Sequence, residues 1–167
     1  MKQVLLVGGG ELKEGYRNVE WDRYSKVCTT NYSILDCPRF SDIWVCGLVK
    51  NKINSLYPKY KYKYAEALIY PTTPHINKRT VLLPSFSIIP ISIYRKLYDE
   101  IGSKPSTGLV GIEVLLRKNY NIDLLGFDFG KSKNRYTKQE AYSVHNLDKE
   151  YLYLSPFIGG GRIKILD

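Results

Sequence analysis

The sequence predicts one α/β domain over residues 1–167, with a mostly parallel sheet flanked by helices. Short continuous apolar runs, such as Val4–Val7 and Ile122–Leu125, are typical of strands buried on both faces of a parallel sheet. These runs alternate with segments of helical periodicity, which is the pattern of an α/β fold. The length suits one domain with its own core, and no internal repeat or linker divides the chain.

Helices are expected in three places. The first runs from Pro90 to about Ile101 and ends at Gly102, because glycine suits the residue after a helix. The second covers residues 106–118, and its apolar residues have the spacing of a core face. Residues 127–144 are polar and are expected to be irregular, before a third helix over about 147–153. Strands are expected at Val4–Val7, Lys26–Thr30, Asp42–Leu48, Ala67–Tyr70, Val81–Leu83, Ile122–Leu125 and Ile163–Leu166.

The formal net charge of +9 favours an anionic partner, such as a nucleotide sugar, a nucleic acid or an anionic lipid surface. A generic basic surface fits the same charge. No apolar run reaches the roughly 18 residues of a transmembrane segment, although peripheral contact with a membrane stays open. The chain enters a strand at once and shows no signal peptide, so a cytoplasmic location is expected.

Cys28, Cys37 and Cys46 are spaced nine residues apart, which matches no zinc-ligand pattern. We expect buried free thiols in a reducing compartment, with no metal and no cofactor. The densest basic and aromatic stretch is Lys59–Tyr64, in which lysine and tyrosine alternate. As a strand it could bind a nucleic-acid strand, or it could be an edge strand protected by its lysines.

Three short motifs place small or acidic residues where a phosphate-bearing ligand could lie. Gly8-Gly9-Gly10 follows the first strand, although Lys13 replaces the last glycine of a dinucleotide fingerprint. Ser106-Thr107-Gly108 opens a helix, whose N-terminal N–H groups suit a phosphate. Gly126-Phe127-Asp128 puts a carboxylate at the carboxyl end of a strand, where open α/β sheets bind ligands. The plainer interpretations are a tight turn, a capped helix and a loop cap.

His145 and Glu150 are five residues apart, about 140° around a helix, so they cannot share one helical face. We expect His145 just before a helix that Asn146 or Asp148 caps, with Glu150 in its first turns. Histidine titrates near neutral pH, so a histidine on such a loop suits general-base catalysis. The other histidine, His75, lies in a proline-rich loop and is expected to be a bystander.

Together and in this order, these motifs resemble those of sialyltransferases, both the animal-type family and the small bacterial enzymes. The resemblance also includes Asn31 after the second strand, Tyr136 in the loop before His145, and His145 with Glu150 as a His-x4-Glu motif. It covers residues 1–35 and 105–154. The first loop differs from the family at Gly9, where an asparagine is usual.

The resemblance implies a variant of the GT-A type of glycosyltransferase fold. It also implies metal-independent, inverting transfer of sialic acid, or a similar acid sugar, from a CMP-activated donor to a glycan or glycolipid hydroxyl. In this picture His145 is the general base, Tyr136 hydrogen-bonds the leaving phosphate, and Glu150 supports the loop that carries His145. The residues left to bind the donor are Gly8, Gly9, Gly10, Asn31, Ser106, Thr107, Gly108, Gly126, Phe127 and Asp128.

Two alternatives stay open at this point. Gly9 and the short chain fit a nucleotide-sugar-binding protein of the same fold that lacks activity. The net charge and Lys59–Tyr64 fit a basic nucleic-acid-binding protein, or another Rossmann-like enzyme, although the resemblance disfavours nucleic acid as a partner.

Overall fold

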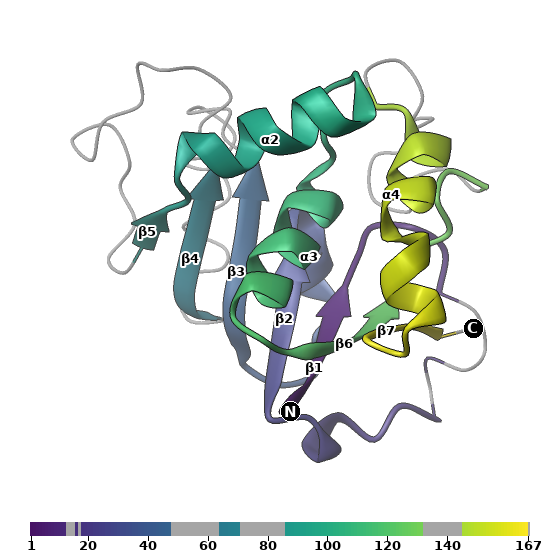
Figure 1. Ribbon diagram of the computed structural model, residues 1–167. Helices are drawn as coiled ribbons and strands as arrows, with labels where there is room; N and C mark the ends of the chain where they lie inside the picture. Colours follow the sequence, from purple (N-terminus) through teal and green to yellow (C-terminus); the bar gives the residue numbers. More distant parts are fainter. Residues whose placement is uncertain (13–15, 17, 48–63, 71–85, 132–144, 167) are drawn as a thin grey trace.

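The computed structural model describes residues 1–12, 16, 18–47, 64–70, 86–131 and 145–166. Its centre is a seven-stranded sheet in the order β5-β4-β3-β2-β1-β6-β7, and every neighbouring pair is parallel (Figure 1). The predicted α/β class is therefore confirmed. The strands are β1 (Gln3–Val7), β2 (Lys26–Thr30), β3 (Ser41–Gly47), β4 (Tyr64–Tyr70), β5 (Phe86–Ile88), β6 (Asn121–Leu125) and β7 (Ile163–Leu166).

The order of the strands reverses beside β1. The chain passes outward from β1 through β2, β3, β4 and β5, then returns to the other side of β1 as β6 and continues to β7. Loops that leave the carboxyl ends of two such neighbouring strands diverge to opposite faces of the sheet. In open α/β sheets this point is where ligands bind.

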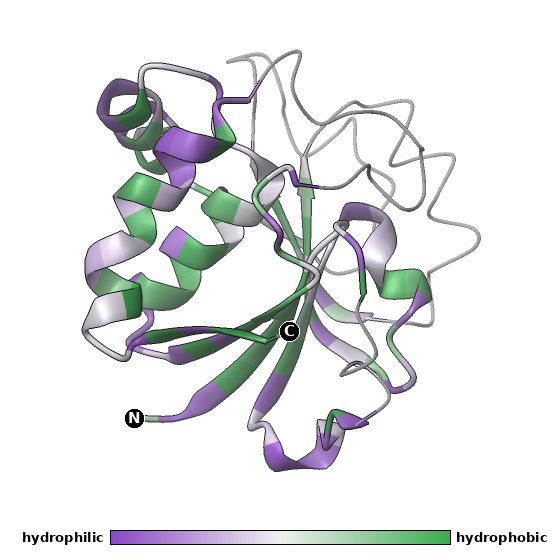
Figure 2. Ribbon diagram, turned by 90° about the vertical axis from the view of Figure 1, so that its right-hand side faces the viewer, coloured by the Kyte–Doolittle hydropathy of each residue, from purple (hydrophilic) through white to green (hydrophobic). Residues whose placement is uncertain are grey.

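The α-helices of the described residues cover one face of the sheet. They are α2 (Ile91–Ile101), α3 (Thr107–Arg117) and α4 (Leu147–Gly159), and Figure 2 shows them together on one side. Within the described ranges, two short 3-10 helices lie toward the other face, η2 (Trp21–Arg23) and η3 (Asn31–Leu35). None of the helices in the described ranges is long and apolar enough to cross a bilayer.

The central helix is α3, in which nine of eleven residues are buried. It packs on the sheet beneath it at Gly111, where an added Cβ would lie 3.4 Å from Val45 Cγ2, so the small residue allows a close approach. Glu113 is also buried, and its carboxylate joins the helices: it accepts hydrogen bonds from Arg117 (2.8 Å) and Tyr153 (3.0 Å) and pairs with Lys96 of α2 (3.8 Å).

Most predicted elements are confirmed within a few residues. The predicted helix stop at Gly102 is confirmed, with φ of +64°. The helix after His145 is longer than predicted because it continues through Pro156 to Gly159. Pro156 cannot donate to the Leu152 carbonyl four residues back, and the Ser155 hydroxyl donates to that oxygen instead, at 2.8 Å.

Sequence patterns missed β5, a strand of only three residues that follows a proline. The expected strand Val81–Leu83 lies outside the described residues, as do residues 59–63 of the alternating stretch. Tyr64, the last residue of that stretch, begins β4, which pairs with β3 on one side and β5 on the other. The strand interpretations of Lys59–Tyr64 therefore stay predictions. The three cysteines are buried thiols that form no disulfide, as predicted.

A buried carboxylate anchors the segment around η2 to the sheet. Asp123 in β6 is only 3% exposed, yet it accepts hydrogen bonds from Gln3 (2.6 Å), Tyr24 (2.8 Å) and Arg23 (3.0 Å). Burial, and then the Asp123 carboxylate, raise the pKa of the Tyr24 hydroxyl to about 12. These contacts fix residues 23–24 against β6.

We predict that Asp123→Ala lowers the free energy of unfolding by about 2–4 kcal/mol, because it leaves buried donors without an acceptor. Urea denaturation followed by circular dichroism measures the change. Asp99→Ala, at an exposed position of α2, is the control and should stay within about 0.5 kcal/mol of wild type. A wild-type unfolding midpoint for Asp123→Ala would show that the network does not anchor this segment.

Candidate functional site

The ends of β1 and β6 meet in close backbone contact at the point where the strand order reverses. Gly8 N–H donates to the Leu125 carbonyl at 2.7 Å, and Gly10 N–H donates to the Gly126 carbonyl at 2.9 Å. A Cβ at Gly8 or Gly10 would lie 2.6 or 2.8 Å from that Gly126 oxygen. Gly126 itself has φ of +70°, in the left-handed region that favours glycine. These glycines are therefore needed for the contact between the two loops.

Phe127 links this contact to the start of α3. An added Cβ would lie 2.7 Å from Phe127 Cε2 at Gly8 and 2.6 Å from Phe127 Cε1 at Gly108, so the ring fills the space between the two glycines. The ring is only partly buried. The glycine loop and the Ser-Thr-Gly helix start, which are almost a hundred residues apart in the chain, thus contact the same aromatic side chain.

Asp128 lies on the other side of the glycine loop. Its carboxyl carbon would be 3.0 Å from a Cβ at Gly10, and its Oδ1 accepts a hydrogen bond from Gly130 N–H at 3.0 Å. The Asp128 carboxylate therefore caps its own loop, which is the non-functional role considered for this motif in the sequence. It also lies at the carboxyl end of β6, beside the predicted phosphate loop.

Asn31 joins three elements at the neighbouring strand ends. It follows β2 with φ of +46°, a conformation that asparagine tolerates better than most residues. Its Nδ2 donates to Thr107 Oγ1 at 3.0 Å, and its Oδ1 accepts from Gly47 N–H at 3.3 Å. Its backbone carbonyl accepts from Trp44 Nε1 at 2.7 Å. Asn31 thus fixes the first residue of α3 against β2 and β3.

Ser106 caps α3, as predicted, and Glu150 holds Ser106. The Ser106 hydroxyl accepts from Leu109 N–H at 3.1 Å and donates to Glu150 Oε2 at 2.6 Å. Ser106 N–H donates to Glu150 Oε1 at 2.7 Å. The expectation that Glu150 supports the loop carrying His145 is therefore incomplete, since the hydrogen bonds of its carboxylate in the described chain go to Ser106.

Glu150 is 2% exposed, and its burial raises the pKa of its carboxyl group, against the opposing effect of the Ser106 hydrogen bonds. A pKa raised by folding means that the folded state favours the protonated acid. Any stability gained in this way is present at low pH and is lost as the pH rises through the folded-state pKa. Ionisation of Glu150 therefore costs stability and does not add to it.

His145 lies just before α4, and Asn146 caps that helix by accepting from Lys149 N–H at 3.1 Å, as predicted. His145 Nδ1 is 2.8 Å from the Lys104 carbonyl oxygen. Because a carbonyl can only accept, Nδ1 carries the proton in the neutral ring, and Nε2 is left with its lone pair. The ring is partly exposed, so that nitrogen is the one suited to take up a proton.

The structure brings the predicted site residues together through these contacts, except for two. Tyr136 lies outside the described residues, and Gly9 is partly exposed within the loop between Gly8 and Gly10. Sequence reasoning missed Lys104 and Gly47, because each contributes a backbone group, and a backbone group leaves no signal in residue type.

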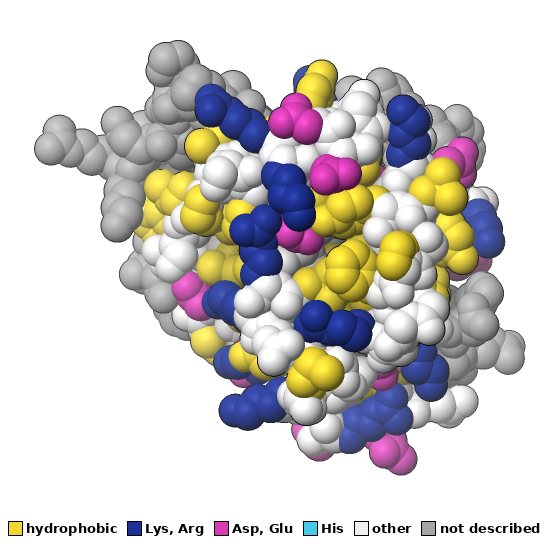
Figure 3. All heavy atoms as spheres, in the orientation of Figure 1, with side chains coloured by type: hydrophobic (Ala, Val, Ile, Leu, Met, Phe, Trp, Pro, Cys, Tyr) yellow, Lys and Arg dark blue, Asp and Glu magenta, His cyan; other side chains and the backbone are white. Residues whose placement is uncertain are grey.

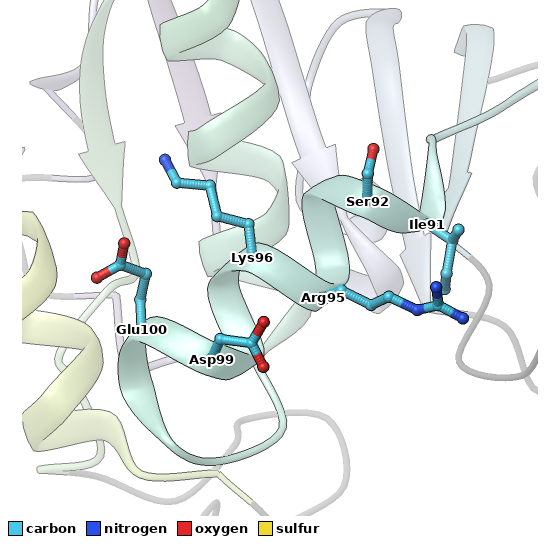
Figure 4. A pocket seen from close by; sticks show the side chains of 6 residues that line it. All are labelled: Ile91, Ser92, Arg95, Lys96, Asp99 and Glu100. Atoms are coloured by element: carbon cyan, nitrogen blue, oxygen red, sulfur yellow. The ribbon is translucent and has the colours of Figure 1, made fainter.

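A hollow of about 660 Å³ lies along the outer side of α2, away from the strand ends at which the predicted site residues meet (Figure 4). Its two cations, Arg95 and Lys96, are balanced by Asp99 and Glu100, and it includes no residue of the strand-end cluster. Across the helical face, basic side chains are spread among acidic and apolar ones (Figure 3). We therefore place the candidate site at the strand ends, where the parallel sheet directs its loops. Within the described ranges, no group of three His, Cys, Asp or Glu side chains is arranged to hold a metal.

Comparison with known proteins agrees with this architecture. Searches of the sequence against protein-family models and against curated proteins give no match. Among solved structures, the chain is similar to that in "Crystal Structure of a Mammalian Sialyltransferase", with a TM-score of 0.60 and 18% sequence identity. The similarity covers 99% of this chain and 68% of that chain. The protein therefore has a Rossmann-like α/β fold of the kind found in a sialyltransferase.

We predict that Gly8→Ala lowers the free energy of unfolding by about 1–3 kcal/mol, because the added methyl group overlaps the Gly126 carbonyl oxygen. Gly159→Ala is the matched control, since an added Cβ there meets nothing within 4 Å. The control should unfold at the same urea concentration as wild type or a slightly higher one. Equal midpoints for both variants would contradict the close contact between β1 and β6.

Proposed function

We propose that the protein is a glycosyltransferase that moves sialic acid, or a similar acid sugar, from a CMP-activated donor to a glycan or glycolipid hydroxyl with inversion and without a metal. The observation that carries the proposal is the convergence of the loop after β1, Asn31, the start of α3 and the loop after β6 at one sheet edge. That edge is where this fold class binds nucleotides. The fold similarity to a sialyltransferase supports the same conclusion.

The donor phosphate would lie at the start of α3. The N–H groups of Leu109 and Val110 are used by Ser106, whereas none of the hydrogen bonds found among the described residues uses Gly108 N–H. An N–H group at a helix N-terminus attracts an anion through its own dipole and that of the helix. A net charge of +9 would favour the encounter with an anionic donor.

The nucleoside would lie between Asn31 and the loop after β6. The Asn31 amide donates one of its two N–H groups to Thr107, so the second can donate to a ribose or base oxygen. Phe127, which is partly exposed, offers an aromatic surface to the base, and Asp128 offers an acceptor to a ribose hydroxyl. Gly8, Gly9 and Gly10 would leave room for the ligand beside this surface.

His145 would accept the proton of the acceptor hydroxyl at Nε2, while Nδ1 stays hydrogen-bonded to Lys104. As the proton leaves, the hydroxyl oxygen attacks the anomeric carbon, and the bond from that carbon to the CMP phosphate breaks. Attack from the side opposite the phosphate inverts the anomeric centre. Tyr136 would donate a hydrogen bond to the departing phosphate, helped by the backbone N–H groups of Thr107 and Gly108.

The direct test is incubation with CMP-sialic acid and a panel of galactose-terminated acceptors, followed by detection of released CMP and sialylated product. We expect both products to form, and to form equally in excess EDTA, because the proposed mechanism uses no metal. CMP binding without turnover would favour the inactive nucleotide-sugar-binding alternative. Loss of turnover in EDTA that is reversed by Mg²⁺ or Mn²⁺ would contradict the metal-independent mechanism.

Replacing His145 with Ala should reduce transfer by roughly 10²–10⁴-fold, the usual contribution of a positioned general base. The acidic limb of the pH–rate profile should disappear, while donor affinity should change little, because the base acts on the acceptor. Steady-state kinetics across pH 5–9 (about the range in which histidine titrates) would measure both. His75→Ala is the control and should behave like wild type. A folded His145→Ala protein with full activity would exclude this mechanism.

A further inference from the structure

The start of α4 contacts the segment before α3 at two points. His145 Nδ1 reaches the Lys104 carbonyl at 2.8 Å, and the Glu150 carboxylate accepts from Ser106 N–H at 2.7 Å and from the Ser106 hydroxyl at 2.6 Å. Between these two contacts lies Pro105, whose buried ring fixes its own backbone φ. Residues 104–106 are therefore held from one side by a single helix start.

The contacts of Glu150 determine the direction in which the Ser106 hydroxyl points. That hydroxyl gives its only proton to Glu150, so its lone pairs are left for Leu109 N–H in the first turn of α3. Without the carboxylate, the hydroxyl can rotate, and Ser106 N–H loses its acceptor. The orientation of the first turn of α3, including Gly108 N–H, then depends on the Asn31–Thr107 hydrogen bond and on packing, without the contact from α4.

A purely stabilising role does not account for this carboxylate. Glu150 is almost fully buried, and its burial raises the pKa of the carboxyl group. A neutral amide of the same size would avoid the cost of burying a charge. What the amide cannot do is accept at both positions that the carboxylate oxygens occupy, because its nitrogen can only donate, whereas Oε1 accepts from Ser106 N–H and Oε2 from the Ser106 hydroxyl.

We propose that Glu150 is a positioning residue, which holds the first turn of α3 in the orientation that binds the donor phosphate. Through Ser106 it also attaches this turn to the short segment that the general base, His145, contacts at Lys104. The proposal rests on the proposed function, and it assigns Glu150 to the donor side of the site as well as to the side of His145. The donor-binding turn and the general base thus contact one short segment, residues 104–106.

The experiment compares Glu150→Gln with Asp148→Asn, which removes an exposed acid from the same first turn of α4. We expect Glu150→Gln to weaken CMP binding by about 10- to 100-fold in calorimetry, the scale on which misplaced binding groups act. The donor KM should rise in parallel. The thermal unfolding midpoint of Glu150→Gln should equal that of wild type or exceed it, and Asp148→Asn should match wild type in CMP affinity.

The other outcomes each have a defined meaning. Unchanged CMP affinity in folded Glu150→Gln would overturn the positioning role, whatever its unfolding midpoint. If that midpoint were also lower than that of wild type, Glu150 would be a structural residue. Failure of the wild-type protein to bind CMP would instead overturn the proposed function.

Ser106→Ala provides an independent test in case Glu150→Gln does not fold. On its own, it should also weaken CMP binding. Where Glu150→Gln folds, the double variant should lose less affinity than the sum of the two single losses, since both changes disturb the hydrogen bond between the Ser106 hydroxyl and Glu150. Strict additivity of the two losses would contradict the coupling between Glu150 and Ser106.

Discussion

The close contact between the ends of β1 and β6 is the constraint on which the rest of the structure depends. Backbone meets backbone there, and only glycine at positions 8 and 10 leaves room for the Gly126 carbonyl. Since β1 and β6 are the strands between which the order reverses, this contact also fixes how the loops diverge from the sheet. Any ligand bound at this edge would lie against a surface whose shape is determined by main chain, and main chain is less adaptable than side chains.

The second determinant is the burial of α3. A helix with almost every residue buried cannot shift along the sheet without losing its packing, so its N-terminus has a fixed position. Polar contacts then define the orientation of that terminus: Asn31 holds it from the sheet, and Glu150 holds it from α4. Apolar packing thus sets the position of the helix, and hydrogen bonds set the direction of its first turn.

The sequence predicted those parts of the fold that are governed by local pattern. Buried strands such as Val4–Val7, the Ser106 cap and the Gly102 stop were all recognisable, because apolar runs and capping residues act through their near neighbours. β5 was missed because three residues make too short a pattern. The role of Phe127 as a ring between two distant glycines could not be predicted, since it arises only from tertiary packing.

The candidate site follows the same division. The motif residues were identified from the sequence, but their contacts were not. Glu150 was expected to act on its own loop, whereas its carboxylate contacts Ser106, which lies 44 residues earlier in the sequence. Lys104 and Gly47 contribute backbone groups, for which residue type gives no evidence. Side-chain chemistry can be read from one sequence, whereas the pairing of a side chain with a distant backbone group requires the fold.

The position of β6 beside β1 has a consequence for folding. Gln3 of β1 pairs with Asn121 of β6, so the centre of the sheet cannot close until most of the chain has been synthesised. Contacts of such large sequence separation carry a high loop-closure cost and slow the folding of parallel sheets. The apolar β1 therefore lacks its β6 partner while the ribosome completes the chain. An unpaired apolar strand favours aggregation, so we expect the nascent protein to depend on chaperones most during that interval.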